Sequence, residues 1–256
     1  DGLLKKVEPK QEKKDEKKRE WRKRDRKVNP MDTVFVSRLT YPNVAFGLDK
    51  LATPQNVLVR NATIWTADKT GRLENTDLLV INGKISKIGK NLKVAPGVLV
   101  IDATGKHVTP GIIDEHSHIC ISKGVNDAGF ASSAMVRIGD VINSDDIAMY
   151  RALAGGVTTI HALHGSANPI GGQLQVIKLK WGLPPDALKF GTAPPTIKFA
   201  LGENVKQSNW GDRNVTRYPQ TRMGVESFFT DKFQSAKEYA AARAAVTSRE
   251  NKSAAA

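Results

Sequence analysis

The pattern of apolar and polar positions predicts a run of short β-strands between residues 55 and 106. The apolar stretches are 57–64, 77–81, 84–88 and 98–102. Asn82 and Gly83 separate two of these stretches, and this dipeptide supplies positive φ at both centres of a type I′ turn, so we expect a hairpin there. We assign this region a structural role and no chemistry.

The next apolar stretch, 108–113, is interrupted by Pro110-Gly111 and ends in a polar cluster that contains His116 and His118. Side chains two positions apart on a strand point to the same face, so the two imidazoles project together. Neutral imidazoles in this arrangement can hold one divalent metal ion. The alternative is a pair of solvated loop histidines, and the apolar strand directly before them favours the metal site.

Alternating helix and strand patterns follow, which is typical of an α/β fold. We predict a helix at 144–154, a strand at 157–164, a turn-rich loop at 165–173, a strand at 196–204 and a helix at 224–249. Ser144 is the expected N-cap of the first helix, with Asp145 and Asp146 over its positive end. Gly155 and Gly156 are expected to end it.

Several residues near the ends of these strands are candidates for substrate contact. His161 and His164 are three apart and face opposite sides of the strand, and His164 is better placed, being nearer its C-terminal end. A structural histidine is the alternative for each. The loop after this strand offers Asn168, Gly171 and Gly172 for close backbone approach to a ligand, with a tight turn as the alternative. Arg137 is either an anion-binding residue or a surface arginine.

Residues 108–119, VTPGIIDEHSHI, resemble the first barrel strand of the amidohydrolase superfamily, in its imidazolonepropionase-like and dihydroorotase-like branch. The resemblance extends to 57–64 and 77–89 upstream and to 155–159 downstream, and covers roughly residues 55–205. It implies a small β-sandwich domain at 31–106, followed at 107–256 by the first part of a (β/α)8 TIM barrel.

The same resemblance implies a metal-dependent hydrolase that acts on carbon–nitrogen bonds of linear or cyclic amides. His116 and His118 would hold a divalent metal, Zn²⁺ by preference, which activates a water molecule. Glu203 is the candidate for a further ligand and Lys198 stands behind it, because members of the family use a strand-borne Glu or a carboxylated Lys. A solvated or helix-capping carboxylate is the alternative for Glu203.

The chain departs from the family pattern after its second strand. A complete barrel needs about 250 residues, whereas roughly 140 follow the first strand, and no histidine occurs after His164. We therefore expect the general base outside this chain and assign no catalytic residue within it. The expected partners are an amide-type substrate and the remainder of the barrel, from further sequence or a second chain. The alternative is a catalytically incomplete fragment that serves as a partner-binding or structural module.

Charge adds a question about nucleic acid, since the 256 residues carry a formal net charge of +13. Residues 1–30 hold 13 Lys and Arg against 7 Asp and Glu, a net of +6, so nearly half of the excess lies in one tail. This tail has few apolar residues and reads as a charged, disordered linker or a solvated helix. With no aromatic residue apart from Trp21, it does not indicate nucleic-acid binding, and contact of residues 19–27 with phosphate or an anionic membrane surface is the alternative.

The remaining features are less specific. Between this tail and the first strands we expect a short strand at 34–36, a turn at 41–43 and packing of the segment against the sandwich. Cys120 reads as a small buried side chain rather than a nucleophile. No apolar run reaches the roughly 18 residues of a membrane span, so we expect a soluble chain. It begins at Asp1 without a signal peptide, which fits a processed or excised product. Export with the signal already removed is one alternative, so the compartment stays open.

Overall fold

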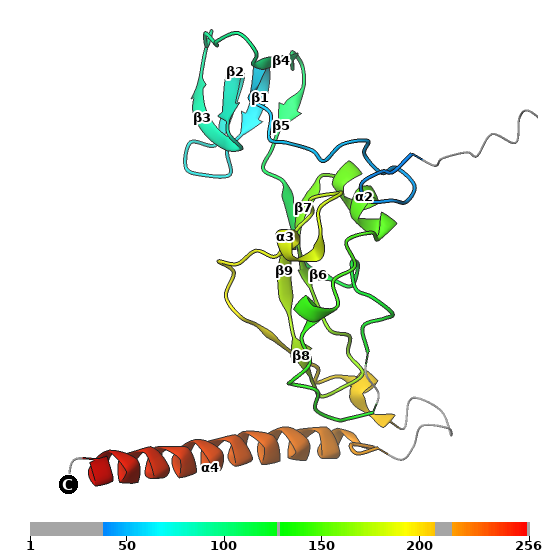
Figure 1. The fold of residues 1–256 in the computed structure, drawn as a ribbon, viewed down its shortest axis with the longest axis vertical. Coiled ribbons are helices and arrows are strands. Elements are labelled where there is room, and N and C mark those ends of the chain that lie inside the picture. The colour runs from blue at the N-terminus through cyan, green and yellow to red at the C-terminus, as the bar shows by residue number, and fades with distance from the viewer. Residues whose placement is uncertain (1–37, 127–128, 208–216, 255–256) are drawn as a thin grey trace, which may run out of the picture. The chain divides into compact units, whose positions relative to one another are not determined.

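The computed structural model describes residues 38–126, 129–207 and 217–254 (Figure 1). Contacts divide the chain into a first unit, residues 1–39, and a second unit, residues 40–256. The linker predicted at 1–30 and the strand predicted at 34–36 lie outside the described residues. All described helices and strands belong to the second unit.

The run of short apolar stretches forms a five-stranded sheet. Its strands are β1 (Val57–Trp65), β2 (Arg72–Ile81), β3 (Lys84–Gly89), β4 (Leu99–Asp102) and β5 (His107–Val108). The hydrogen-bonding order is β3-β2-β1-β4, and β5 also pairs with β1. β1 runs antiparallel to β2 and parallel to β4 and β5.

The hairpin predicted at Asn82 and Gly83 is confirmed. Their φ angles are 50° and 73°, as a type I′ turn requires, and β2 pairs antiparallel with β3 directly across the turn. The turn therefore sets the register of the two strands, with Ile81 opposite Lys84.

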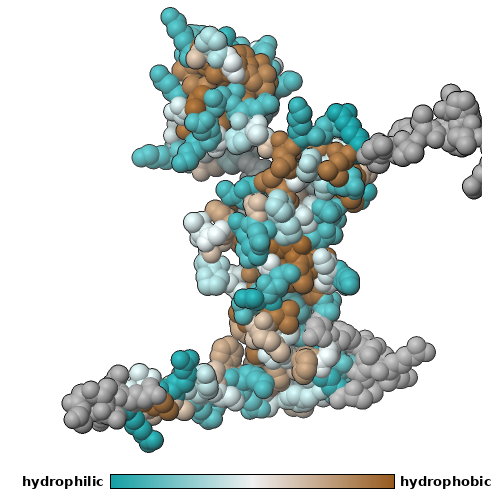
Figure 2. Space-filling model, in the orientation of Figure 1, coloured by the Kyte–Doolittle hydropathy of each residue, from teal (hydrophilic) through white to brown (hydrophobic). Residues whose placement is uncertain are grey.

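One cluster of buried side chains lies on this sheet, formed by Ala62, Ile64, Leu78 and Ala103. The apolar residues 99–101 of β4 stay exposed, and Figure 2 shows apolar surface over part of the sheet. A sandwich would need a second sheet facing the first. The described residues contain no such sheet, so the β-sandwich stays a prediction.

A second, three-stranded sheet carries the candidate site. Its order is β6 (Ile112–Ser117), β7 (Val157–Ala162) and β9 (Gln175–Lys178). β6 and β7 are parallel and are joined through the helix α2 (Ile147–Ala154), as a parallel pair requires a crossover. β9 then runs antiparallel to β7 and was not predicted. The α/β class is confirmed, while the described residues form partial sheets and no closed barrel.

The apolar core of this region lies between the sheet, α2 and the helix α3 (Pro185–Leu188). Met149 of α2, Ile160 of β7, Ile177 of β9 and Leu188 of α3 are fully buried and belong to one cluster. Burying one such side chain contributes about 1.5–3 kcal/mol. This cluster therefore fixes β7 against its two neighbouring helices.

The helix predicted at 144–154 begins later than expected. α2 starts at Ile147, and its N-cap is Asp146, whose side chain accepts a hydrogen bond from the Ala148 N–H at 2.9 Å. The prediction of Ser144 as the cap was wrong, because the Asp146 carboxylate takes the N-terminal donors instead. The predicted end is confirmed, since the helix stops at Ala154 and Gly156 has a φ of 87°.

The segment that precedes the first sheet packs against the core around α2. This corrects the prediction that it lies against the sandwich. The turn predicted at 41–43 is present, with Tyr41 bridged to Leu48. Leu48 packs against the core around α2, and the Phe46 ring stacks on Tyr150 with centroids 4.9 Å apart. The Trp181 indole N–H also donates to the Phe46 carbonyl at 2.9 Å.

Two short strands lie within the loop predicted at 165–173 and within the strand predicted at 196–204. β8 (Ile170–Gln173) pairs antiparallel with β10 (Ile197–Phe199) in a separate two-stranded sheet. β10 is therefore only three residues long and does not extend the sheet of β6 and β7. Short 3₁₀ turns, η1 (Ile138–Asp140) and η2 (Glu203–Val205), lie in the neighbouring loops.

The helix predicted at 224–249 is confirmed with longer bounds, as α4 (Arg222–Ala254). Its first turns are held by apolar contacts, since Val225 and Phe229 pack with Ala200 and Val205. Figure 2 shows hydrophilic surface along much of α4. Among the described residues, no helix has both the length and the apolar character that crossing a membrane requires.

Candidate metal centre

His116 and His118 lie where β6 ends, and the structure brings their rings together. The ring centroids are 5.2 Å apart and the planes are nearly perpendicular, at 87°. β6 pairs with β7 as far as Ser117 and Ala162, with register shifts between Ile112 and Ile113 and between Asp114 and Ser117. The neighbouring strand therefore supports the strand end up to the residue between the two histidines. The pair thus projects at the carboxyl ends of two parallel strands, where α/β folds place their ligands.

One hydrogen bond settles which nitrogen of His118 is available. Its Nδ1 lies 2.9 Å from the carbonyl oxygen of Leu163, the residue after β7. Because a carbonyl can only accept, Nδ1 must carry a proton, and in the neutral ring the lone pair is then on Nε2. This is the arrangement that orients metal-binding histidines in proteins.

Lys198 of β10 approaches the histidine pair. Its Nζ lies 3.4 Å from the Nε2 of His116, and its stem packs beside Gly171, where an added Cβ would come within 3.0 Å of the Lys198 Cβ. Burial lowers the pKa of the Lys198 amine, because the charged form loses hydration. Lys198, which the sequence analysis placed behind Glu203 as a candidate ligand, therefore lies beside the histidine pair.

Glu203 does not lie beside the histidine pair. It begins η2, and its carboxylate pairs with the Lys206 amine at 2.5 Å and with Arg222 at 3.8 Å. Across the part of the chain that the structure describes, no three or more His, Cys, Asp or Glu side chains are grouped to hold a metal ion. The structure gathers His116, His118 and Lys198, and it does not bring Glu203 to them.

His161 is nearer to the pair than the sequence indicated. It lies on β7, its Nε2 is 2.8 Å from the Thr196 hydroxyl, and both the Glu115 backbone and the charge of His116 affect its ionisation. Burial is the main cause that lowers its pKa, so the ring is neutral at neutral pH. β7 ends at Ala162, so His164 follows the strand, and the predicted alternation between His161 and His164 stays a prediction. The sequence could not show which face of β7 meets His116.

The residues predicted to contact substrate are buried in the loop after β7 and in β8. His164 is 3% exposed, and its Nδ1 lies 3.0 Å from the Gly165 carbonyl. The Asn168 amide donates to the Phe130 carbonyl at 2.7 Å and to the Ser133 hydroxyl at 3.0 Å. Gly171 and Gly172 are buried too, and a Cβ on Gly172 would come within 2.6 Å of a backbone carbonyl. Their role as substrate-binding residues stays a prediction.

A cavity of about 350 Å³ opens beside His118. It is lined by His118, Val125, Asn126, Gly165, Ser166, Ala167 and Asn204. The Asn126 side chain accepts a hydrogen bond from the Ala167 N–H at 3.1 Å, and Gly165 leaves no room for a Cβ next to the same amide. The loops after β6 and β7 thus interlock at Asn126. Sequence reasoning missed this residue, since a lone asparagine in a loop carries no pattern.

Two other candidates have structural roles. Cys120 is fully buried, as predicted, and burial, with the nearby Asp146 charge second, raises the pKa of its thiol to about 12. Its backbone N–H donates to the Asp146 carboxylate at 2.8 Å. Arg137 is exposed and pairs with Asp140 at 2.9 Å, in line with the surface interpretation.

Comparison with known proteins agrees with the strand-end motif. No family model matches the chain. The amidohydrolase tasK of Hapsidospora irregularis is 31% identical over 214 residues, covering 71% of this chain and 22% of that protein. A dihydroorotase of Thermoanaerobacter sp. (strain X514) is 31% identical over 124 residues, covering 48% of this chain and 25% of the enzyme.

Among solved structures, an amidohydrolase from Thermotoga maritima MSB8 superposes with a TM-score of 0.64 and 35% identity. The match covers 73% of this chain and 49% of that one. The chain therefore belongs to the amidohydrolase superfamily. It spans about a quarter of the length of these two sequence relatives and about half of the solved structure.

Proposed function

We propose that the protein to which this chain belongs hydrolyses carbon–nitrogen bonds of amide type, linear or cyclic, with a divalent metal ion, Zn²⁺ by preference. The observation that carries the proposal is the perpendicular histidine pair at the end of β6, with the Nδ1 of His118 committed to the Leu163 carbonyl. Membership of the amidohydrolase superfamily supports the reaction class.

The donor set fits a metal in part. His116 and His118 would hold it through ring nitrogens, and Lys198 is the third side chain within reach of the pair. When bound, such a cation supplies Lewis-acid polarisation of a carbonyl group and activates a water molecule. Glu203 could join the set only by leaving its ion pairs with Lys206 and Arg222. We therefore rank Lys198 above Glu203 as the further ligand.

The residues around the pair have distinct tasks in this proposal. The interlocked loops of Asn126 and Ser166 present neutral polar groups to the substrate beside His118. His164 and Asn168 in the loop after β7, and Gly171 and Gly172 in β8, would shape the substrate-binding side of the site. His161, neutral and hydrogen-bonded to Thr196, would orient the pair rather than bear charge. The general base, and the strands that close a (β/α)8 barrel after a β-sandwich, would come from outside this chain.

Metal content of the purified chain tests the proposal. We expect close to one equivalent of zinc or a similar cation in the wild type and its loss in the His116→Ala/His118→Ala double variant. His107→Ala is the matched control, because His107 is an exposed strand histidine that contacts Trp65 and should leave metal content unchanged. An empty wild-type chain after equilibration with zinc would contradict the metal site.

The third ligand is tested by the same measurement. We expect Lys198→Ala to weaken zinc binding more than Glu203→Ala does. If Glu203→Ala weakens zinc binding more than Lys198→Ala does, Glu203 is the further ligand. Its ion pairs would then break when the metal binds.

A second candidate function rests on the edge of β6. This strand pairs only with β7 among the described strands, and Ile112 and Ile113 are 54% and 68% exposed. Such an edge is a site for pairing with another strand. The chain would then act as a catalytically incomplete, partner-binding module, with the remainder of a barrel as its partner. Sedimentation measures association of the chain. Association that is lost in Ile113→Lys but retained in the double histidine variant would favour this function.

A further inference from the structure

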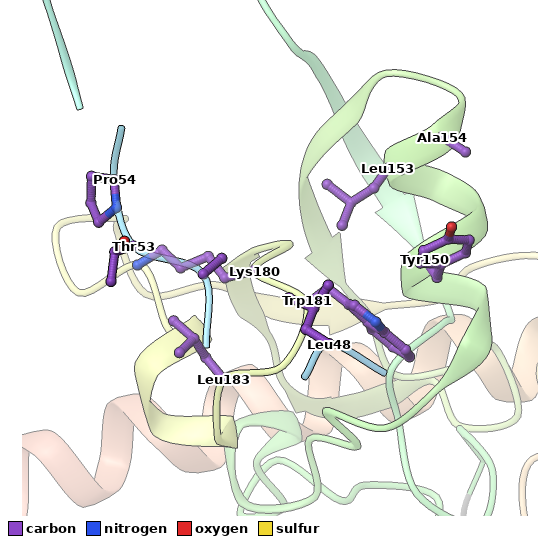
Figure 3. Close-up of a pocket in the computed structure, with 10 residues that line it drawn as sticks. Leu48, Thr53, Pro54, Tyr150, Leu153, Ala154, Lys180, Trp181 and Leu183 are labelled. Atoms are coloured by element: carbon purple, nitrogen blue, oxygen red, sulfur yellow. The ribbon is translucent and has the colours of Figure 1, made fainter. Parts of the chain in front are cut away.

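A second cavity, of about 740 Å³, lies on the region built around α2 (Figure 3). Three segments form it: residues 48–54, the C-terminal half of α2, and residues 180–183 after β9. The side chains that shape it most are Leu48, Pro54, Tyr150, Leu153, Lys180 and Trp181. Its volume lies within the roughly 300–1,000 Å³ of small-molecule sites.

The cavity lies at the other end of β7 from the histidine pair. Leu153 and Ala154 come directly before β7, and the Leu179 N–H, next to Lys180, bonds the Thr158 carbonyl at the start of that strand. His118, in contrast, bonds the residue that follows β7. Thr158 and Leu163 are five residues apart, which is about 17 Å along a strand. A ligand here would not touch the candidate metal ligands.

Aromatic packing holds one wall of the cavity in place. The rings of Tyr150 and Trp181 are tilted against each other with centroids 5.7 Å apart, and Phe46 stacks on Tyr150 from outside the lining. The Trp181 N–H is used by the Phe46 carbonyl, so the indole offers carbon atoms to the cavity. The wall is therefore apolar and preformed.

The charge at the cavity has one sign. Lys180 is the only ionisable lysine, arginine or acidic residue among the lining residues, and Figure 3 shows its side chain extended toward Thr53. Its amine donates one hydrogen bond, to the Ala187 carbonyl at 3.3 Å, which leaves two further protons. An anionic group beside an apolar body complements this lining.

We propose that this cavity binds a free apolar monocarboxylate, with its apolar body against Tyr150, Leu153 and Trp181 and its carboxylate toward Lys180. Apolar contact supplies most of the affinity, because the lining offers few polar groups. The Lys180 charge supplies selectivity for an anion over a neutral or cationic molecule of the same shape. This site is independent of the hydrolase proposal.

The test uses the full chain labelled with 5-fluorotryptophan and observed by ¹⁹F NMR. The sequence has four tryptophans, and Trp181→Phe assigns the signal of the cavity. The probe is 2-naphthoate, compared with the neutral 2-naphthylmethanol and the cationic 2-naphthylmethylammonium. We expect a saturable shift of the Trp181 signal, with 2-naphthoate binding about fivefold more tightly than the alcohol, as one exposed ion pair allows, and the ammonium binding weakest.

Variants separate charge from shape. Lys180→Met keeps the apolar stem, and it should remove the preference for 2-naphthoate without weakening the alcohol. Lys178→Met is the matched control, since the Lys178 amine lies over Phe190, 4.5 Å from the ring centroid, and not in the cavity. Ala154→Phe fills the cavity from an exposed helix position and should abolish binding of both probes without disturbing the core.

Three results would overturn the proposal. The Trp181 signal could show no saturable response to 2-naphthoate. The three probes could bind equally, which would remove the role of Lys180. Binding could also survive Ala154→Phe, which would place the probe on another apolar surface.

Discussion

Replacing Asp146 by alanine should destabilise the chain far more than replacing its neighbour Asp145. Asp146 uses both carboxylate oxygens: Oδ1 accepts from the Ala148 N–H at 2.9 Å, and Oδ2 accepts from the Cys120 N–H at 2.8 Å. The first bond caps α2, and the second ties the chain just after His118 to that helix. One side chain thus joins the candidate site to the core.

The expected magnitude follows from these two bonds. Loss of an N-cap costs about 1 kcal/mol. Cys120 is fully buried, so its N–H would lose its partner away from water, at a cost of about 1–3 kcal/mol. The Asp146→Ala variant should therefore lose about 2–4 kcal/mol of unfolding free energy.

Urea denaturation followed by circular dichroism measures this loss. Asp145→Ala is the control, because Asp145 is exposed and a surface substitution stays within about 0.5 kcal/mol. Asp146→Asn should fall between the two, because its amide oxygen can cap the helix while its NH₂ group cannot accept from Cys120. An Asp146→Ala variant as stable as Asp145→Ala would refute the reasoning.

Three further predictions concern other parts of the second unit. The Cys120 thiol, with its pKa raised to about 12, should react with a disulfide reagent at pH 8 only after unfolding, and rapid labelling of the native chain would contradict its burial. Met149→Ala should cost about 2–5 kcal/mol and Met149→Leu less than about 1.5 kcal/mol in the same denaturation assay, with equal losses speaking against a tightly packed core. The Thr104 hydroxyl, which donates to Asp102 at 2.7 Å, lowers the pKa of that carboxyl, so its stabilising effect is present above the unfolded-state pKa and is lost as pH falls through the folded one. Thr104→Val should raise the Asp102 pKa in an NMR titration, and an unchanged titration would remove Thr104 as the main cause.

Local signals predicted the local elements. The Asn82-Gly83 hairpin followed from backbone conformations that few residues adopt, and the structure has the same turn. The strand before His116 followed from a short apolar run between turn residues. The start of α2 was missed by three residues because Ser144 and Asp146 are both good caps, and the sequence does not show that the Cys120 N–H draws Asp146 into place.

The pairing of strands that are distant in the chain could not be predicted from the sequence. The strand predicted at 196–204 is the three-residue β10, and its backbone pairs with β8, a partner that the sequence did not indicate. Lys198 lies on this strand and approaches His116, which is 82 residues away in the sequence. Alternation along a strand identified which residues share a face, but not which distant strand lies opposite.

The antiparallel course of β9 has a consequence for how the second sheet can grow. β9 occupies the side of β7 away from β6, and its own outer edge is bridged by Lys189. An additional parallel strand could therefore pair with the edge of β6 that is free among the described strands, next to the exposed Ile112 and Ile113 and to His116. Enlargement of this sheet would therefore proceed from one edge, and the first added strand would pair with the strand that carries His116.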